Sequence, residues 1–546
     1  MLDKIPPEVL TLIAYHSCLP TLLAPSTLLQ TSRVIRDTIS PSANPRLYAR
    51  LYRTAFDTAA IERRLGEVNA SQYTVELQRR VSSLYRLSRM VDRGDLTAIR
   101  DEDVWTIYLM LIENDGKNLE QLLDLNGILH LPTFLRLYHE QHLLAPALQP
   151  GYPAENIGRS LIMWIGWLLS QHNSGVPEPS VERDERLFVL RPYVFAPQQY
   201  EAYFAPWTIL NLPLSSTTPR SSRASPYIAD LSPKPRTVAI NYFGKDTSIC
   251  PPILSHAAIL RFFTQAETSG RIAKTARPAS ENNVSVTESD SDDDDLLVAQ
   301  RKDLLSSSLL HDRDFGRLLS CHDPFTCRGL KPSSWRGSME GCWEGNFSFF
   351  DFDAFREMLA GQSRALYAGE FGEQHQVWRL KETFVRPKRE QLQGRKGKSR
   401  APPLTGPMTN AGFPTDVPSS TDAGLDTARA EVTTLNATIR QQLDAMVGYE
   451  IVPENEMDTA VDEDDGLEIL VTGVGHSAWG RFILKGRVRA WDGLASLVKE
   501  YAPDSRGKWI YRGYVVAGDT FVGRWRDTFT PEAFIGYEGT FILNRR

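Results

Sequence analysis

Hydrophobic side chains recur every three or four positions through the N-terminal third of the chain. The segments VWTIYLMLI at residues 104–112 and NLEQLLDLNGILHLPTFLRLYHEQHLL at residues 118–144 are typical. Because this spacing gathers apolar side chains on one face of a helix, it predicts an α-rich region over residues 5–171. Over residues 186–265 the helical period breaks down into aromatic residues, prolines and short strand-like runs, so the fold of that segment stays open.

The C-terminal part carries short segments rich in aromatic and β-branched residues, most of them punctuated by glycine. In the last predicted hairpin, residues 517–519 form the turn, and Phe521, Gly523 and Trp525 share one face of the returning strand. About eight antiparallel strands are predicted, the number that closes a small barrel. They lie in GCWEGNFSFFDF, RALYAGEFG, HQVWRLKETFV, LEILVTGVG, GRFILKGRVRAW, KWIYRGYVV, TFVGRWRDT and YEGTFILNRR.

Two polar tracts separate these regions. ASENNVSVTESDSDDDD is dense in acids, and RPKREQLQGRKGKSR opens a second tract that ends in VDEDD. Neither tract holds enough apolar surface to offset the entropy of ordering, so both are predicted to be disordered.

The fold class predicted is therefore α+β multidomain, with an all-α N-terminal part and a C-terminal antiparallel β-barrel interrupted by a disordered insertion. The predicted parts are residues 1–57, a small helical module; 58–265, a helical or mixed middle domain; 266–325, an acidic linker; 326–385, the first part of the barrel; 386–465, the disordered insertion; and 466–546, the second part of the barrel.

Composition and charge narrow the class of protein. The chain has 546 residues, too many for one hydrophobic core, and its 42% apolar and 23% charged residues are typical of globular proteins. A formal net charge of -6, with acids and bases interspersed, favours neither nucleic acid nor a membrane as partner. The longest apolar run, at residues 161–169, is about half the length that crosses a bilayer.

Cysteine usage and the N-terminus indicate the compartment. No secretory leader is recognisable in the first residues, and the five cysteines are too scattered for a disulfide framework. The expected location is cytoplasmic and/or nuclear. CHDPFTC places Cys321, His322 and Cys327 close together, but a zinc site needs four ligands and no second pair follows, so neither a metal nor another cofactor is expected.

The N-terminal stretch IPPEVLTLI predicts the start of a helix. Pro6 and Pro7 stand where a helix tolerates proline, and the acid after them complements the positive end of the helix dipole. Val9, Leu10 and Ile13 then form an apolar stripe. Three short helices over about fifty residues make a marginal core, so a partner is expected to cover part of this surface.

These residues resemble the F-box family. Its three elements are matched by Ile5, Pro6, Glu8, Val9, Leu10 and Ile13, then by Ser32, Arg33 and Arg36, and then by Leu47 and Tyr48. The chain departs from the family at Ile35, where an aromatic residue is common, and at Tyr48, where tryptophan is common. An ordinary N-terminal helix hairpin without a partner is the alternative.

The resemblance implies docking onto the adaptor subunit of an SCF-type (Skp, cullin, F-box) ubiquitin ligase, and through it onto the cullin. The residues expected to bind the adaptor are Ile5, Pro6, Pro7, Val9, Leu10, Ile13, Leu29, Ile35, Leu47 and Tyr48.

The barrel segments carry a second resemblance. GCWEG places Trp343 on the first predicted strand, and arginines close the last one. This looks like the lipocalin-like arrangement, in which a tryptophan of the first strand packs under a basic residue from the last, a cation over an indole face. An F-box ahead of such a split barrel resembles a group of F-box-only substrate receptors whose barrel holds the degron. That resemblance implies a non-catalytic receptor for a protein substrate.

Arginine and tryptophan, which are enriched at binding hot spots, are densest in the barrel segments. The candidates for binding the substrate are Trp343, Arg489, Trp491, Trp509, Arg512, Arg524, Trp525 and Arg526. They predict either a groove for an acidic or C-terminal peptide, or tryptophans that fill the barrel while the arginines stay solvated outside.

The same residues suggest two rival functions. A lipocalin-like carrier or scaffold without a ligase role would enclose a small apolar ligand in a sealed cavity lined by small residues. An enzyme is disfavoured because the barrel segments hold only His375 and His476 and no acid–base cluster. TGVGHSA has dinucleotide-like glycine spacing, but the residues after it alternate like a strand, and Trp479 replaces the second glycine of a nucleophile elbow.

Overall fold

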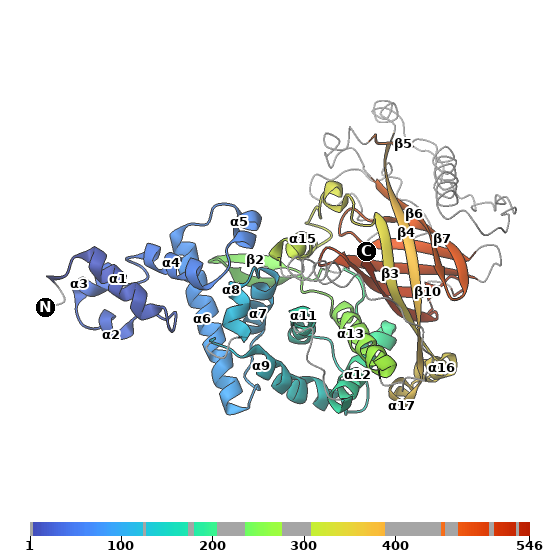
Figure 1. Ribbon diagram of the computed structural model, residues 1–546, viewed down its shortest axis with the longest axis horizontal. Coiled ribbons are helices and arrows are strands. Elements are labelled where there is room, and N and C mark those ends of the chain that lie inside the picture. The colour runs from blue at the N-terminus through green and yellow to red at the C-terminus, as the bar shows by residue number, and fades with distance from the viewer. Residues whose placement is uncertain are drawn as a thin grey trace, which may run out of the picture.

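The computed structural model places the N-terminal helices and the β-barrel at opposite ends of an elongated molecule (Figure 1). An arc of further helices lies between them. The structure describes residues 4–123, 127–172, 180–204, 235–275, 307–387, 449–453, 468–501, 507–530 and 534–546. The α+β layout predicted from the sequence is confirmed.

Four helices form the N-terminal module: α1 (Pro7–Cys18), α2 (Ser26–Leu29), α3 (Arg33–Ile39) and α4 (Pro45–Ala55). Pro7 begins α1, as the sequence predicts. Ser32 caps α3 by accepting a hydrogen bond from the Ile35 amide at 3.2 Å, and Asn44 caps α4 through the Leu47 amide at 3.2 Å. The core of the module is made of Leu10, Ala14, Cys18, Ile35, Ile39, Leu47 and Tyr48.

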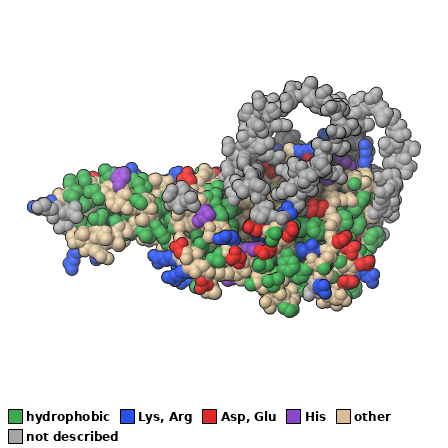
Figure 2. Space-filling view, turned by 60° about the horizontal axis from the view of Figure 1, so that its bottom comes forward, with side chains coloured by type: hydrophobic (Ala, Val, Ile, Leu, Met, Phe, Trp, Pro, Cys, Tyr) green, Lys and Arg blue, Asp and Glu red, His purple; other side chains and the backbone are tan. Residues whose placement is uncertain are grey.

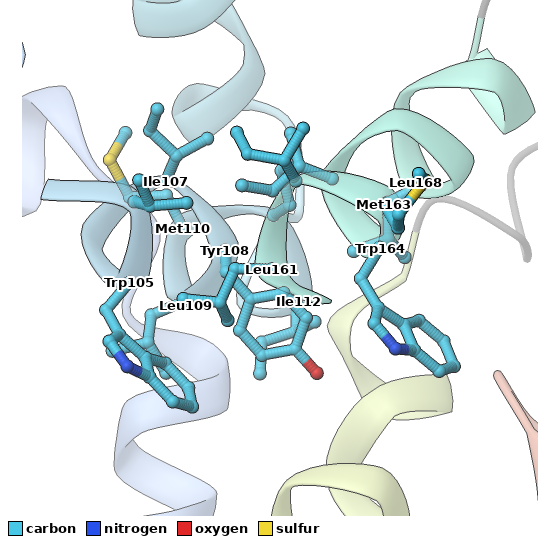
Figure 3. Packing of buried hydrophobic residues seen from close by; sticks show 14 of the residues in the cluster. Trp105, Ile107, Tyr108, Leu109, Met110, Ile112, Leu161, Met163, Trp164 and Leu168 are labelled. Carbon is cyan, nitrogen blue, oxygen red and sulfur yellow. The ribbon is translucent and has the colours of Figure 1, made fainter. Parts of the chain in front are cut away.

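A larger helical body follows the module. Its elements are α5 (Ala59–Leu65), α6 (Ala70–Arg93), α7 (Asp101–Ile112), α8 (Lys117–Leu123), α9 (Leu131–Tyr138), the π-helix η2 (His139–Leu144), α10 (Ala145–Ala147), α11 (Ile157–His172), α12 (Ser180–Phe195), the 3-10 turn η3 (Pro197–Gln199) and α13 (Leu254–Thr275). Helix α7 is buried on all sides from Asp103 to Ile112, which explains its unbroken apolar sequence. It packs against α11 through large side chains such as Tyr108, Leu161 and Trp164 (Figure 3).

Residues 186–265, where the sequence left the fold open, continue this body. Helix α12 runs through Pro192, so the helical pattern persists past the point where prolines and aromatic residues obscure it. A hairpin of β1 (Val238–Tyr242) and β2 (Lys245–Ile249) then leads into α13. The segment STTPRSSRASP, expected to be a loop, lies outside the described residues.

A buried charged network ties the β1–β2 hairpin to the helices. Arg80 donates from Nε to Glu76 at 2.9 Å and from Nη2 to Glu113 at 2.5 Å, and all three side chains are fully buried. Tyr242 of β1 donates its hydroxyl to Glu113 at 2.7 Å, and the Phe243 amide donates to Glu76 at 3.2 Å. Because removing one partner would leave a buried charge unpaired, this network fixes the hairpin against α6 and α7.

Eight antiparallel strands close into a barrel: β3 (Gly341–Phe350), β4 (Phe371–Pro387), β6 (Glu468–Ser477), β7 (Gly480–Val488), β8 (Ala495–Tyr501), β9 (Lys508–Val516), β10 (Thr520–Asp527) and β11 (Glu538–Arg545). The strands pair with one another in the order β3-β11-β10-β9-β8-β7-β6-β4. The sheet closes because β4 also pairs with β3, where Trp343 lies opposite Trp378. The turn between β9 and β10 has Ala517 at φ 47° and Gly518 at φ 77°, as a tight hairpin requires. The predicted barrel and hairpin are confirmed.

The two ends of the barrel differ. The 3-10 turn η6 (Pro332–Trp335) and the residues after it close one end, where Trp335 donates to the Ala490 carbonyl at 2.8 Å. Glu382 holds the same segment by accepting from the Met339 amide at 2.6 Å and the Gly337 amide at 2.7 Å. The other end, called the mouth below, is where β6 turns into β7 and where the β8–β9 and β10–β11 connections lie.

Several predicted boundaries need correction. Within the expected linker 266–325, α13 extends to Thr275, and residues 308–320 form η5 (Ser308–His311) and α15 (Asp312–Ser320), because α15 buries Phe315 and Leu318. RALYAGEFG is not a strand: α17 (Ser363–Ala368) follows α16 (Phe352–Leu359) there. In the expected insertion 386–465, β4 reaches Pro387 and pairs with the short strand β5 (Tyr449–Ile451). Residues 276–306, 388–448 and 454–465 of these tracts lie outside the described residues.

Within the described part of the chain, every helix is too short or too polar to cross a membrane.

Candidate functional site

The predicted adaptor-binding residues divide into a buried and an accessible set. The buried set is Leu10, Ile35, Leu47 and Tyr48, which are at most 5% exposed. These side chains form part of the core of the N-terminal module, so they support its surface but cannot contact a partner directly. The accessible set lies mainly on α1 and at its start, and includes Pro6, Pro7, Val9 and Ile13, with Ile5 and Leu29 half-buried.

Helix α1 exposes an apolar face that the sequence showed only in part. Val9, Leu12 and Ile13 are 45%, 48% and 39% exposed. They are one, three and four positions apart, so they lie together on one side of the helix. Leu12 was absent from the predicted set. The module that carries this face projects as a narrow arm from the body of the molecule (Figure 2).

Trp343 and Trp525, two of the predicted substrate-binding residues, lie inside the barrel. Trp343 is fully buried and donates its indole N–H to the Met339 carbonyl at 2.9 Å. The guanidinium of Arg545, on the last strand, lies 5.0 Å from the centre of its ring, as the lipocalin-like arrangement predicts. Trp525 donates to the Ser348 carbonyl at 3.0 Å, so both rings serve the core.

Arg512 of β9 and Arg524 of β10 face the helical body. Arg524 is 3% exposed and donates to the carbonyls of Tyr193 at 2.8 Å and Val194 at 3.0 Å, at the C-terminal end of α12. The half-buried Arg512 offers its carbonyl to the hydroxyl of Tyr203 at 3.3 Å. Both residues join the barrel to the helices. They therefore neither line a peptide groove nor stay solvated outside the barrel, which were the two arrangements that the sequence predicts.

Arg489 and Trp491 lie in the connection between β7 and β8, at the closed end. Arg489 forms a fully buried ion pair with Asp492 at 2.6 Å, and Tyr514 donates to the same carboxylate at 2.8 Å. The indole N–H of Trp491 donates to the Cys327 carbonyl at 3.1 Å. In the described structure, Arg489 and Trp491 hold the β7–β8 connection in place.

The interior near the mouth holds a buried lysine that the sequence did not single out. Lys499 is 1% exposed, and its Nζ lies 3.0 Å from Oε1 of Gln376. The ring centres of Phe482, Tyr501 and Phe347 lie 3.9, 4.9 and 5.1 Å from the same atom. Burial lowers the pKa of Lys499 to about 7. Its signal in the sequence was its position on the inward face of SLVKEY, between Leu497 and Tyr501.

Aromatic and aliphatic side chains surround the mouth. Trp479, on the β6–β7 turn, is 37% exposed and lies edge-on to Phe347, with ring centres 5.3 Å apart. Trp509, which was predicted as a site residue, is half-buried beside Trp525, with ring centres 5.2 Å apart.

The connection after β10 adds an exposed apolar loop at the mouth. Phe529, Phe534 and Ile535 are largely exposed. Asp527 holds this loop by accepting from the amides of Phe529 and Thr530 at 2.9 and 2.7 Å. The predicted site residue Arg526 donates to the carbonyls of Thr530 and Phe534 at 3.1 and 2.8 Å.

A small cavity of about 30 Å³ lies where α7, α11, α13, α15 and the barrel meet. His256 of α13 lines it, is 2% exposed, and has no hydrogen-bond partner for Nε2 among the described residues. Burial, followed by the nearby charges of Arg524, Arg317 and Arg236, lowers the pKa of His256 to about 3. The imidazole is therefore neutral in the folded protein at physiological pH.

The cysteines and histidine of CHDPFTC do not gather into a metal site. Cys327 lies 3.2 Å from Nε2 of His322, whereas Cys321 donates its thiol to the Trp491 carbonyl at 3.1 Å. Among the residues that the structure describes, no group of three or more His, Cys, Asp or Glu side chains is arranged to hold a metal ion.

The fold and these sites define a two-ended molecule, with an apolar helix face at one end and an aromatic barrel mouth at the other. Comparison of the chain with known protein families, with curated proteins and with solved structures finds no match.

Proposed function

We propose that this chain is the substrate receptor of an SCF-type ubiquitin ligase. The N-terminal module docks onto the adaptor subunit, which connects it to the cullin, and the mouth of the barrel binds the target protein. The chain supplies no chemistry of its own. Ubiquitin transfer is accelerated because the lysines of the bound target are held at a high effective concentration near the charged E2 enzyme.

The apolar face of α1 is the observation that carries this proposal. Three large aliphatic side chains, Val9, Leu12 and Ile13, are exposed side by side on a module of four short helices. Contiguous exposed apolar side chains favour a protein partner. Two of these residues, Val9 and Ile13, match the F-box pattern. Leu10, which also matches it, is buried and packs α1 against the core of the module.

The placement of the two ends supports the same division of roles. The N-terminal module and the barrel lie far apart along the long axis, with the helical body between them (Figure 1). Phe529, Phe534 and Ile535 at the mouth are 79%, 67% and 47% exposed, and the amides of the neighbouring Thr530 and Tyr537 donate to Asp527. Large apolar side chains exposed near one another favour binding of another protein.

The test is capture of the full-length chain by a purified SCF adaptor subunit. The double variant Val9→Asp with Ile13→Asp places two charges on the exposed face of α1, and we expect it to weaken capture at least tenfold. Val181→Asp is the matched control, since Val181 is 77% exposed at the start of α12 and far from the module. Failure of the wild-type chain to bind the adaptor, or equal binding by all three proteins, would overturn the proposal.

A further inference from the structure

Cys327 and His322 lie side by side in the turn that follows α15. Sγ of Cys327 is 3.2 Å from Nε2 of His322, which is within hydrogen-bond distance. The pair takes no part in the docking or the target binding proposed above. A thiol in contact with an imidazole is the arrangement that turns a cysteine into a nucleophile, because the ring can take up the thiol proton.

The hydroxyl of Thr237 orients the imidazole from its other side. Oγ1 of Thr237 lies 3.1 Å from Nδ1 of His322 and donates its own hydrogen to the His322 carbonyl at 3.3 Å. Since that hydrogen is already used, the hydroxyl accepts from Nδ1, and the hydrogen-bond network assigns the ring proton to Nδ1. Nε2 therefore presents a lone pair to the thiol. Thr237, His322 and Cys327 take the places of orienting group, base and nucleophile.

Hydrogen bonds fix the turn that brings the thiol and the imidazole together. The Cys327 amide donates to the Asp323 carbonyl at 2.8 Å. The Asp323 carboxylate accepts from the Phe325 amide at 2.9 Å and from the Thr326 hydroxyl at 2.7 Å. The Cys327 carbonyl accepts from the indole of Trp491 at 3.1 Å. Because the two side chains are already in place, little reorganisation precedes a reaction of the thiol.

The surroundings distinguish Cys327 from the other four cysteines. Burial raises the pKa of Cys18 to about 11, that of Cys250 to about 12 and that of Cys321 well above its usual value, so these enclosed thiols stay protonated. Cys327 is half-buried and Cys342 is exposed, so both are open to solvent. Among the described hydrogen bonds, an imidazole reaches the thiol of Cys327 alone.

We propose that Cys327 is a modification site for conjugated carbonyl compounds, with His322 as the general base. Nε2 takes the thiol proton while Sγ bonds to the β-carbon, and the π electrons of the carbon–carbon double bond move toward the carbonyl oxygen to give an enolate. The imidazolium then returns the proton to the α-carbon. The product is a thioether; no group leaves and no oxidant is needed. An addition suits this pair because the proton removed first is needed again at the end. The proposal does not depend on the role as a receptor.

Activation by a neutral imidazole predicts a distinctive pH profile. Burial lowers the pKa of His322, against the opposing effect of the Asp323 carboxylate, so the ring is neutral at pH 7 and can accept a proton. The other charged group on the neighbouring segment, Arg236, is paired with Glu201 at 2.6 Å. A thiol without a base loses about tenfold in rate per pH unit below its pKa of about 8.5. Cys327 should lose about threefold or less between about pH 8 and pH 6.5.

The experiment follows modification of the full-length chain by acrylamide, a small conjugated amide, with mass spectrometry that resolves each cysteine. Trypsin releases Cys321 and Cys327 together in the peptide 318–328, so the buried Cys321 is an internal control. Cys342 lies on another peptide and is the control for an exposed thiol. Time courses from about pH 6.5 to pH 8 are recorded for the wild type and for His322→Gln, Thr237→Val and Thr237→Ser.

We expect Cys327 of the wild type to react at least tenfold faster than Cys342 at about pH 6.5, with Cys321 unmodified. His322→Gln should slow Cys327 at least tenfold there and give it the pH profile of Cys342, because an amide does not accept the proton. Thr237→Val should slow Cys327 about threefold or more, and Thr237→Ser, which keeps the hydroxyl, should react like the wild type. Equal rates for Cys327 and Cys342 in the wild type, or an unchanged rate in His322→Gln, would overturn the proposal. Equal rates in Thr237→Val and Thr237→Ser would overturn the orienting role of Thr237.

Two readouts separate reactivity from folding. In a variant that has lost its fold, Cys321 becomes modified as well, whereas a specific loss of the base leaves Cys321 protected and the rate of Cys342 unchanged. The pH profile of wild-type Cys327 needs no variant, and a profile parallel to that of Cys342 contradicts the role of His322. The adaptor test is separate, because Val9→Asp with Ile13→Asp changes only the exposed face of α1 and leaves the rate of Cys327 as it is.

Discussion

Arg545 lies over Trp343, with its guanidinium carbon 5.0 Å from the centre of the indole ring, and so joins the last strand of the barrel to the first. The same guanidinium donates to the Gly337 carbonyl at 2.8 Å and to the carbonyl of Ser338. Trp343 in turn donates to the Met339 carbonyl at 2.9 Å. One cation–indole pair thus holds the segment that closes the end of the barrel.

Arg545→Ala should lower the free energy of unfolding by about 2–3 kcal/mol, because it removes the cation–indole contact and leaves two carbonyls without a charged donor. Urea denaturation measures the change. Arg546→Ala is the control: Arg546 is 60% exposed and pairs with Glu344 at the surface, where solvent screens the pair, so its loss should leave the free energy of unfolding nearly unchanged. Equal losses in the two variants would show that the indole contact contributes nothing.

The parts of this structure that the sequence predicts depend on local pattern. Period-two alternation in β10 places Phe521 and Trp525 inside the barrel, and the N-terminal prolines mark the start of α1. The contact between Trp343 and Arg545 followed from resemblance to the lipocalin-like arrangement. Each of these features is decided by neighbours in the chain or by a short motif.

The parts that could not be predicted depend on contacts between distant segments. Arg524 looks like a solvated strand residue until α12, about 330 residues earlier, covers it. Lys499 is one charge in an alternating strand, and only the closed barrel shows that its amine is buried among aromatic rings. Leu10 and Val9 are adjacent apolar residues, and only the packing of α1 on α3 and α4 decides which is buried.

Arg524→Met should loosen the junction between the barrel and the helical body. The variant leaves the carbonyls of Tyr193 and Val194 without their charged donor at the end of α12, where a cation also complements the helix dipole. We expect a loss of about 2–3 kcal/mol in the free energy of unfolding. Hydrogen exchange of the α12 and β10 amides should accelerate, while that of α1 stays unchanged. Arg481→Met, at an exposed turn of the barrel, should leave both regions protected.

Substitutions at Leu10 and Val9 should affect the stability of the N-terminal module to different extents. Leu10 is 5% exposed in the core of the N-terminal module, so Leu10→Ala should destabilise that module by about 2–4 kcal/mol. Val9→Ala, at a 45% exposed position, should change its stability by about 0.5 kcal/mol or less. Hydrogen exchange of the α1–α4 amides reports both changes. Faster exchange in Val9→Ala than in Leu10→Ala would contradict the packing described for α1.

His256 should make the junction of helices and barrel sensitive to acid. Its pKa is lowered from 6.5 to about 3 in the folded protein, so between these values the unfolded chain binds a proton that the folded chain does not. Stability therefore falls as the pH falls from 6.5 toward 3, by up to about 1.4 kcal/mol per pH unit from this group. His256→Gln should flatten the dependence of unfolding free energy on pH between 6.5 and 4, whereas His16→Gln, at an exposed position of α1, should not. Parallel curves for the wild type and His256→Gln would show that this buried imidazole does not control the acid response.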